Sequence, residues 1–212
     1  MIANGAERFV SLSDFFIAAE CAVFAFLLYS GMARKGLGGW AIAFFASASL
    51  SALLGGVTHG FFADESTAAH RALWTATMLA IGLGGLTAYV LSIKLLRLCG
   101  SWVWLAVLAW LVYVWDIFFI SDDFRAAVAF YLPAVILLAV AFLVRYMRSR
   151  EGAALLGAAA AMLGLLGAYV QQSGWNLHPL YFNHNTVYHL IQAVSFYGLF
   201  VAFRGCLLHR HT

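Results

Sequence analysis

Histidine is the residue type most able to do chemistry in this chain. The stretch Trp175–Tyr197, WNLHPLYFNHNTVYHLIQAVSFY, carries three of the seven histidines, His178, His184 and His189. His189 lies inside a segment apolar enough to span a membrane, where an imidazole is costly to bury and needs partners. Imidazole is a common zinc ligand, and three histidines plus a water molecule form a catalytic pattern. The partners of His189 therefore decide what this region can do.

Two further histidines lie around a short acidic turn. His59 is in LLGGVTHGFF, and His70 follows eleven residues later in STAAHRALW, so an antiparallel hairpin brings them to similar depth. Asn185 and His189 are four residues apart and share a helix face. His184 is about 140° from His189 at about 100° per residue, so it joins only from the helix entrance. We predict a metal held by His59, His70, His184 and His189.

A carboxylate is also expected at this depth. Asp116 lies about one turn from the end of the apolar run 102–120, and it is the predicted general base beside a metal-bound water. Glu20 lies inside the run 14–33, where it either pairs with a polar neighbour or orients a histidine. If the histidines only form hydrogen bonds near the membrane surface, none of this chemistry follows.

The composition indicates a membrane protein. The 212-residue chain is 64% hydrophobic and 10% charged, whereas soluble domains are about half apolar and about a quarter charged. Seven apolar runs are long enough to cross about 30 Å of hydrocarbon. They cover residues 14–33, 40–62, 70–93, 102–120, 126–145, 153–170 and 185–204. We predict an all-α, polytopic membrane protein with one seven-helix domain over residues 1–212.

Basic residues set the expected orientation, because cytoplasmic segments of membrane proteins are enriched in lysine and arginine. One side collects Arg34, Lys35, Lys94, Arg97, Arg145, Arg148, Arg150, Arg204 and Arg210. The other side has only Arg8, Arg71 and Arg125. We expect the N-terminus outside and the C-terminus in the cytoplasm, in a bacterial inner (plasma) membrane. The histidines then lie in the outer leaflet.

The sequence argues against several classes of function. The net charge of +3 comes from loop arginines and does not predict nucleic-acid binding. Cys21, Cys99 and Cys206 are scattered, without metal-type spacing or a disulfide framework. The chain has no CxxCH motif for covalent haem, and its seventh apolar run has no lysine for a retinal Schiff base. The expected partner is membrane lipid.

The pattern of these residues resembles the CREST superfamily, which includes alkaline ceramidases and the progestin and adiponectin receptors. In that pattern a serine and a histidine four residues apart end the second span, an aspartate opens the third, and His-x-x-x-His lies on the seventh. His59 matches the second-span histidine, and His189, in HNTVYHLIQAVSFYGLF, is similar to the second histidine of the seventh span. The resemblance implies a seven-helix membrane hydrolase or receptor with histidine-bound zinc.

Three positions carry a different residue type, namely Gly55 for the serine, His70 for the aspartate and Asn185 for the first histidine of the seventh span. The resemblance therefore carries over two metal ligands directly, His59 and His189, with His70 as the replacement third ligand. The family's serine and aspartate hold the oxyanion and the water, so Asp116 would act as the base here.

The sequence thus predicts a metal-binding integral membrane protein, with zinc or another transition metal, that hydrolyses a lipid amide or ester. Two alternatives stay open. One is a non-enzymatic metal- or haem-binding membrane subunit, and the other is a small transporter whose histidines only form hydrogen bonds. Bound metal and turnover of a lipid substrate distinguish the three.

Overall fold

The computed structural model describes residues 5–31, 36–121 and 123–208. In this part of the chain it is all-α, with seven helices that are each long and apolar enough to cross a membrane. They are α1 (Gly5–Gly31), α2 (Leu37–Phe61), α3 (Ala68–Leu96), α4 (Ser101–Phe119), α5 (Phe124–Ser149), α6 (Gly152–Ser173) and α7 (His184–Leu208). The predicted spans are confirmed in number and order, but α1 begins at Gly5 rather than at residue 14.

Three of the basic residues used to predict the orientation, Arg34, Lys35 and Arg210, lie outside the described residues. The helix ends that are described follow local chemistry. The Thr67 hydroxyl accepts a hydrogen bond from the backbone N–H of His70 at 3.1 Å and caps α3. Gly174 ends α6 with a φ of 68°, a left-handed conformation that glycine adopts without strain.

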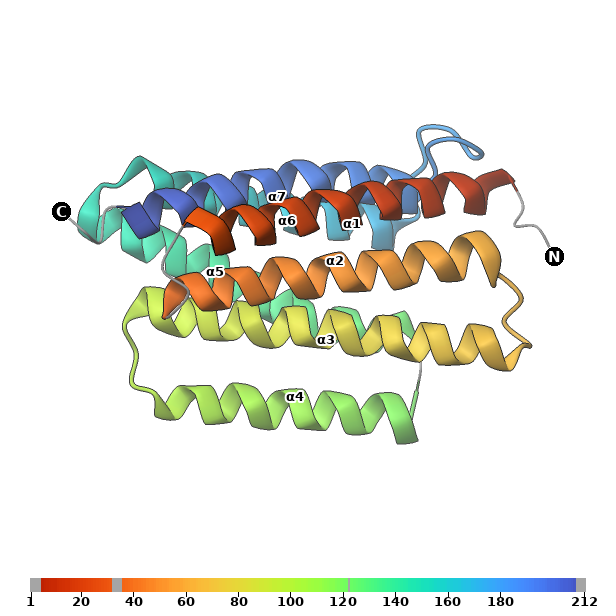
Figure 1. Cartoon of the computed structure of the whole chain (residues 1–212), viewed down its shortest axis with the longest axis horizontal. Helices are drawn as coiled ribbons and strands as arrows, with labels where there is room; N and C mark the ends of the chain where they lie inside the picture. The colour runs from red at the N-terminus through yellow and green to blue at the C-terminus, as the bar shows by residue number, and fades with distance from the viewer. Residues whose placement is uncertain (1–4, 32–35, 122, 209–212) are drawn as a thin grey trace.

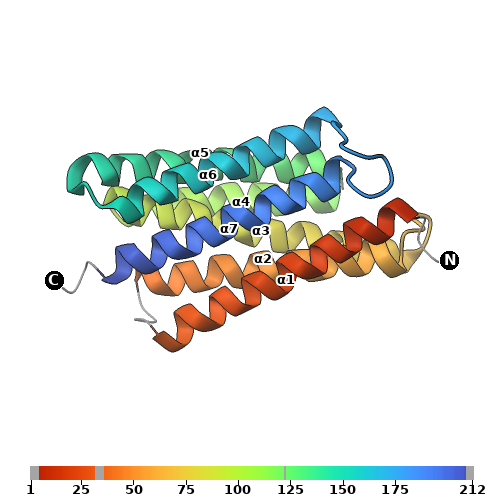
Figure 2. The same cartoon turned by 90° about the horizontal axis from the view of Figure 1, so that it is seen from above.

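Six of the helices close a ring. Helix α1 packs between α2 and α7, and the ring continues through α3, α5 and α6 back to α7. Helix α4 lies outside this ring, mainly against α3, at the edge of the bundle (Figure 1). Only 17% of its most apolar window is buried inside the protein. Figure 2 shows the same arrangement from above, with α7 crossing the middle of the bundle. Helix α4 is therefore a peripheral helix.

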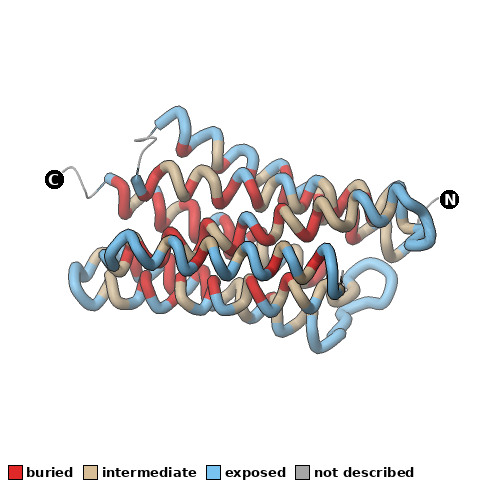
Figure 3. The backbone as a smooth tube through the Cα atoms, turned by 90° about the horizontal axis from the view of Figure 1, so that it is seen from below, coloured by how far each residue is buried: buried red, intermediate tan, exposed pale blue. Residues whose placement is uncertain are grey.

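The core between the ring helices combines phenylalanine rings with many alanine and leucine side chains. Phe44, Phe45, Phe142 and Phe203 are fully buried, and further buried positions lie between the helices while the outer faces are exposed (Figure 3). The Phe142 ring packs on Gly157, where an added Cβ would lie 2.5 Å from it. Gly157 therefore allows α5 and α6 to approach closely. The apolar outer faces are those expected of helices surrounded by lipid.

Glycines also bring α1 close to α2, and this contact positions the site. The Ser11 hydroxyl donates to the Gly56 carbonyl oxygen at 2.7 Å. A Cβ at Gly60 would lie 2.5 Å from the Ser11 oxygen, and one at Gly56 would lie 3.1 Å from the Asp14 Cβ. Side chains larger than hydrogen at these two positions would separate the helices. The polar face of α1 is thus held directly against the end of α2.

The opposite end of the bundle is fixed by an ion pair. Arg145 on α5 donates to the Glu151 carboxylate through Nη2 at 2.8 Å and through Nε at 3.0 Å. The same Nη2 donates to the Cys206 carbonyl oxygen on α7 at 3.4 Å. The two charged side chains are only 13% and 19% exposed. This contact joins α5, the start of α6 and α7 at the end where most described basic residues lie.

Candidate functional site

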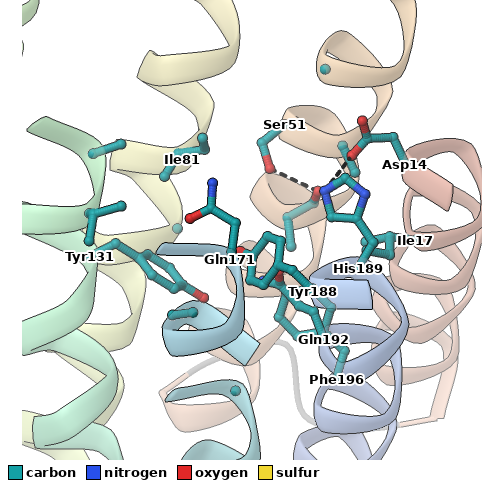
Figure 4. Close-up of a pocket in the computed structure, with 18 of the residues that line it drawn as sticks. Asp14, Ile17, Ser51, Ile81, Tyr131, Gln171, Tyr188, His189, Gln192 and Phe196 are labelled. Atoms are coloured by element: carbon teal, nitrogen blue, oxygen red, sulfur yellow. Dashed lines mark hydrogen bonds and ion pairs between the residues drawn. The ribbon is translucent and has the colours of Figure 1, made fainter. Parts of the chain in front are cut away.

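A cavity of about 340 Å³ lies inside the six-helix ring. Side chains from α1, α2, α3, α5, α6 and α7 line it, and none of the described α4 residues does. Its wall is amphiphilic. Asp14, His59, His189 and several amide and phenol groups form the polar part, whereas residues such as Phe44, Val135, Leu138 and Leu199 form the apolar part. Figure 4 shows side chains from different helices facing this space.

The first functional group at this cavity is a carboxylate–imidazole pair. Glu7, in the first turn of α1, lies 2.7 Å through Oε2 from Nδ1 of His59, in the last turn of α2. A carboxylate can only accept, so the proton of the neutral imidazole is on Nδ1 and its lone pair is on Nε2. No described residue donates a hydrogen bond to Nε2, and His59 lines the cavity. Glu7 thus leaves Nε2 as the basic nitrogen of His59, a residue that lines the cavity.

The second group joins three side chains. Ser13 Oγ lies 2.8 Å from Nδ1 of His189, and Asp14 Oδ1 lies 3.3 Å from Nε2 of the same ring. The Asp14 and His189 side chains are 8% and 12% exposed, and both line the cavity. Figure 4 shows the Asp14–His189 contact from the cavity side. Ser13 does not line the cavity, so it contacts His189 without being part of the cavity wall.

The single hydroxyl proton of Ser13 restricts the protonation of His189. Ser13 Oγ also lies 2.7 Å from the Val10 carbonyl oxygen, to which it donates. Ser13 then accepts from Nδ1–H of His189. Nε2 of the neutral ring therefore carries a lone pair that lies 3.3 Å from Asp14 Oδ1, and a proton placed on either atom would bring the two groups together. A pair of this kind can release a proton to a group in the cavity and take it back.

Helix α1 supplies three of the side chains at this site, Glu7, Ser13 and Asp14. The sequence interpretation did not identify this role of the helix. Glu7, Ser11 and Asp14 recur at spacings of four and three, so they lie on one helix face. Ser13 lies beside that face and turns to α7. The predicted span began only at residue 14 because the first turns are polar. The spacing of Glu7, Ser11 and Asp14 was the signal that could have identified this face.

His70 is not placed at the cavity. Its Nδ1 lies 2.6 Å from the Phe62 carbonyl oxygen, and its ring stacks on Trp74 at 6.3 Å between centroids. It is not among the residues that line the cavity, although its predicted neighbour His59 is. The hairpin between α2 and α3 does bring both histidines to the Trp74 ring, since His59 meets its edge at 6.2 Å. Trp74 therefore lies between the two imidazoles.

The remaining predicted residues have different places. His184 lines the cavity at the start of α7, where the Asn176 side-chain oxygen lies 3.2 Å from its Nδ1. Asp116 is on α4, outside the ring, and does not line the cavity. Glu20 has one buried carboxylate oxygen, Oε2, with no hydrogen-bond partner among the described residues. Glu20 does not line the cavity either.

The described residues contain no group of three or more His, Cys, Asp and Glu side chains that could hold a metal ion. Helices α2 and α7 do bring His59 and His189 to one cavity, with Asp14 from α1. Nδ1 of each of these two imidazoles is taken by an α1 side chain. Zinc binding by the four histidines stays a prediction, and the side chains as placed do not assemble its ligand set.

The two positions that differ from the CREST pattern on α2 and α7 also face this region. Beside Gly55, an added Cβ would lie 3.4 Å from Asp14 Oδ2, so the Asp14 carboxylate occupies the space next to this glycine. Asn185 lines the cavity, and its Oδ1 accepts from Gln171 Nε2 at 3.4 Å. This contact leaves the Asn185 Nδ2 group as a donor.

A family model matches residues 9–207, which include all but the first turn of α1 and the last residue of α7. The chain belongs to DUF6962, a family of unknown function. In this DUF6962 member the matched segment contains Asp14, His59 and His189, while Glu7 precedes it. No curated protein and no solved structure matches the chain. The CREST resemblance therefore stays a prediction from the residues alone.

Proposed function

We propose that this DUF6962 member is an integral membrane hydrolase that cleaves a lipid amide or ester inside the ring of helices. The observation that supports it is the Glu7–His59 pair, which leaves Nε2 of a cavity-lining imidazole as its basic nitrogen, in the same amphiphilic cavity as the Asp14–His189 pair. Ionisable side chains within membrane spans are rare and mark functional sites by default. A cavity with one polar part and one apolar part fits a lipid with a polar linkage.

His59 is the general base of the proposed reaction. Its Nε2 takes a proton from a water molecule, and the oxygen of that water forms a bond to the substrate carbonyl carbon. Glu7 keeps the ring in the correct tautomer and stabilises the imidazolium that forms, as a carboxylate does for an imidazole base. The developing oxyanion accepts a hydrogen bond from Nδ2 of Asn185, whose amide is oriented by Gln171.

The Asp14–His189 pair is the general acid. When the tetrahedral intermediate breaks, the bond between the carbonyl carbon and the nitrogen or oxygen of the leaving group is cleaved. The leaving group takes the proton that Asp14 and His189 share. The proton on His59 then returns to this pair, which restores both groups and leaves a carboxylic acid with an amine or alcohol. The acyl chain lies against Leu138 and Leu199 in the apolar part of the cavity.

A zinc-dependent hydrolase is the second form of this proposal. The resemblance implies zinc, and Nε2 of His59 is the nitrogen that remains to bind a metal. His59, His189 and Asp14 would hold the ion, which would supply a more acidic water. The described side chains do not form a three-ligand group as they stand. The mechanism above therefore contains no step through a metal.

The membrane side and the cell compartment are also part of the proposal. The described basic residues at the far end include Lys94, Arg97, Arg148 and Arg204, and this bias supports a cytoplasmic C-terminus. The end of the cavity that His59 and His184 line then lies toward the outside of a bacterial inner membrane. A substrate would come from the outer leaflet.

Purified protein in lipid nanodiscs tests the proposal with matched panels of N-acyl amides and acyl esters. We expect hydrolysis of at least one lipid class. His59→Gln should lower kcat/KM at least about 100-fold, because it removes the general base. His70→Gln, the same change outside the cavity, should leave turnover unchanged. Equal loss in both variants would contradict the assigned base.

Elemental analysis and a visible spectrum belong to the same experiment. Stoichiometric zinc that is lost in His189→Ala but not in His70→Gln would support the zinc form. Turnover without metal would support the mechanism derived above. A visible absorption band without any turnover would replace the hydrolase by the non-enzymatic haem- or copper-binding alternative.

A further inference from the structure

The polar wall of the cavity does not end at the Asp14–His189 pair. On α7, Tyr188, His189, Gln192 and Ser195 recur at spacings of one, three and three residues, and all of them line the cavity. Gln192 lies three residues beyond His189, which is about 4.5 Å along the helix axis. Figure 4 shows Gln192 and Tyr188 on the α7 side and Tyr131 reaching in from α5. An alkyl chain alone cannot form hydrogen bonds with these polar side chains.

The hydrogen-bonding capacity of this polar wall is only partly used inside the protein. The Ser195 hydroxyl donates to the Ala160 carbonyl oxygen at 2.8 Å, so it is satisfied. The Gln192 amide is a hydrogen-bond partner of the Tyr188 phenol, and the Tyr131 phenol belongs to the lining of the same cavity. A side-chain amide has two donor hydrogens and an oxygen with two lone pairs. One phenol uses at most part of that capacity, and the rest faces the cavity.

Burial of polar groups at this depth in the membrane costs free energy unless the groups form hydrogen bonds. Burying an amide without a hydrogen bond costs free energy, and hydrocarbon offers no compensation. Gln192 and Tyr131 project from different helices into the same space. Neither residue belongs to the proposed acid or base. A ligand that carries a hydrogen-bonding group at this level would satisfy both.

We infer that Gln192 and Tyr131 form a specificity subsite for an acyl chain that bears a hydroxyl or carbonyl group close to the hydrolysed bond. The inference rests on the proposed function. The scissile carbonyl beside His59 determines how far along the acyl chain from the hydrolysed bond the recognised group must lie. The recognised group is uncharged, since among the described residues that line the cavity Asp14 is the only acidic one and none is a lysine or arginine. Gln192 donates to and accepts from that group, and Tyr131 provides a further hydroxyl.

Such a site discriminates more strongly than an apolar pocket. A site built to hydrogen-bond a substrate hydroxyl disfavours the analogue without it, because its own polar groups are then left unpaired. An apolar pocket hardly distinguishes the two. The expected preference is therefore large enough to measure by binding alone.

The experiment measures binding in His59→Gln protein, so that its result does not depend on turnover. The probes are three N-acyl amides of equal chain length, one unsubstituted, one with a hydroxyl on the third carbon and one with a hydroxyl at the far end. We expect the third-carbon hydroxyl to tighten Kd at least about 10-fold relative to both others. Gln192→Leu and Tyr131→Phe should each reduce this preference several-fold.

Tyr169→Phe is the matched control, because it removes one phenol from a residue that is 70% exposed on the outer face of α6. It should leave the preference intact. Tyr131→Phe keeps the ring, so a folding defect does not obscure its result. Equal affinity for the three probes, or a preference that survives both cavity variants, would overturn the subsite. If turnover is absent but the preference follows Gln192, the subsite stands and the hydrolase proposal fails.

Discussion

Two of the three imidazoles that line the cavity, those of His59 and His189, are held through Nδ1 by residues of α1. Glu7 holds His59 at 2.7 Å, and Ser13 holds His189 at 2.8 Å. A fixed Nδ1 determines both the tautomer and the ring orientation, so the chemistry is left to Nε2. The two Nε2 atoms differ in their surroundings, since that of His189 faces Asp14 and that of His59 has no described donor. This difference is the reason for the acid and base roles that we propose.

Replacement of Glu7 tests the orientation of His59 without any activity assay. In wild-type protein with ¹⁵N-labelled histidine, NMR should show His59 with its neutral-state proton on Nδ1. Glu7→Leu removes the acceptor and should produce a mixture of tautomers. Glu7→Gln keeps an acceptor oxygen and should largely preserve the wild-type tautomer. An unchanged spectrum in Glu7→Leu would show that Glu7 does not orient the ring.

Ser13→Ala tests the orientation of His189. The variant removes the only described partner of Nδ1 but leaves Asp14 in place. We expect kcat to fall about 10-fold to 100-fold, the usual effect of losing a group that orients a functional histidine, while KM stays within a few-fold. Ser30→Ala is the control, because Ser30 is exposed near the far end of the same helix and its hydroxyl contacts only the Leu27 carbonyl oxygen. A pure KM effect would contradict a positioning role.

At the level of elements, the contact between α1 and α2 determines whether the site is assembled. Gly56 and Gly60 allow the polar face of α1 to approach, and Ser11 bonds the backbone there. The apolar pattern predicted the seven spans, because uninterrupted hydrophobic length is a local property. It did not reveal that Glu7 and Ser13 contact His59 and His189, since helix pairing depends on packing between segments far apart in the sequence. His70 was predicted at the site for the same reason.

Gly60→Ala should weaken this contact. The added methyl group would lie 2.5 Å from the Ser11 oxygen and 3.2 Å from the Ser11 Cβ, and overpacking of this kind costs about 1–3 kcal/mol. Gly31→Ala is the matched control, because nothing lies within 4 Å of its added Cβ. Thermal unfolding in detergent should show a lower Tm for Gly60→Ala only. A stabilised Gly60→Ala protein would contradict the close approach of α1 to α2.

For the whole molecule, the ion pair between Arg145 and Glu151 and the site occupy opposite ends of one ring. Arg145→Met should destabilise the protein by about 1–3 kcal/mol, because it removes charge-assisted hydrogen bonds from partly buried groups. Arg125→Met is the control, since Arg125 is 86% exposed and lies 3.9 Å from Asp123, where a pair is worth about 0–1 kcal/mol. Denaturant titration measures the free energy of unfolding of the Arg145→Met and Arg125→Met variants. Equal effects would show that the Arg145 contact does not hold α5 to its neighbours.

Cys99 reports the orientation of the whole molecule. It is exposed between α3 and α4, at the end opposite His59 and His184, whereas Cys21 and Cys206 are buried. The hydrogen bond with Ser101 lowers the pKa of the Cys99 thiol, so more thiolate is present at neutral pH and labelling slows as the pH falls through that pKa. A membrane-impermeant maleimide should label inverted vesicles but not intact spheroplasts, and Cys99→Ser should remove the signal. Labelling from outside would reverse the proposed topology.

The peripheral place of α4 has a consequence for how the sequence can change over time. Only Ala106, Tyr113 and Ile117 of this helix are buried, at spacings of seven and four residues that form one narrow stripe. Substitutions elsewhere on α4 need only keep the segment hydrophobic, so the amino-acid sequence of this helix can vary widely among distant relatives. Helix α1, at the chain start, has to preserve both its glycine-matched face and its polar side chains. A comparison of many relatives should therefore find tighter constraint in α1 than in α4.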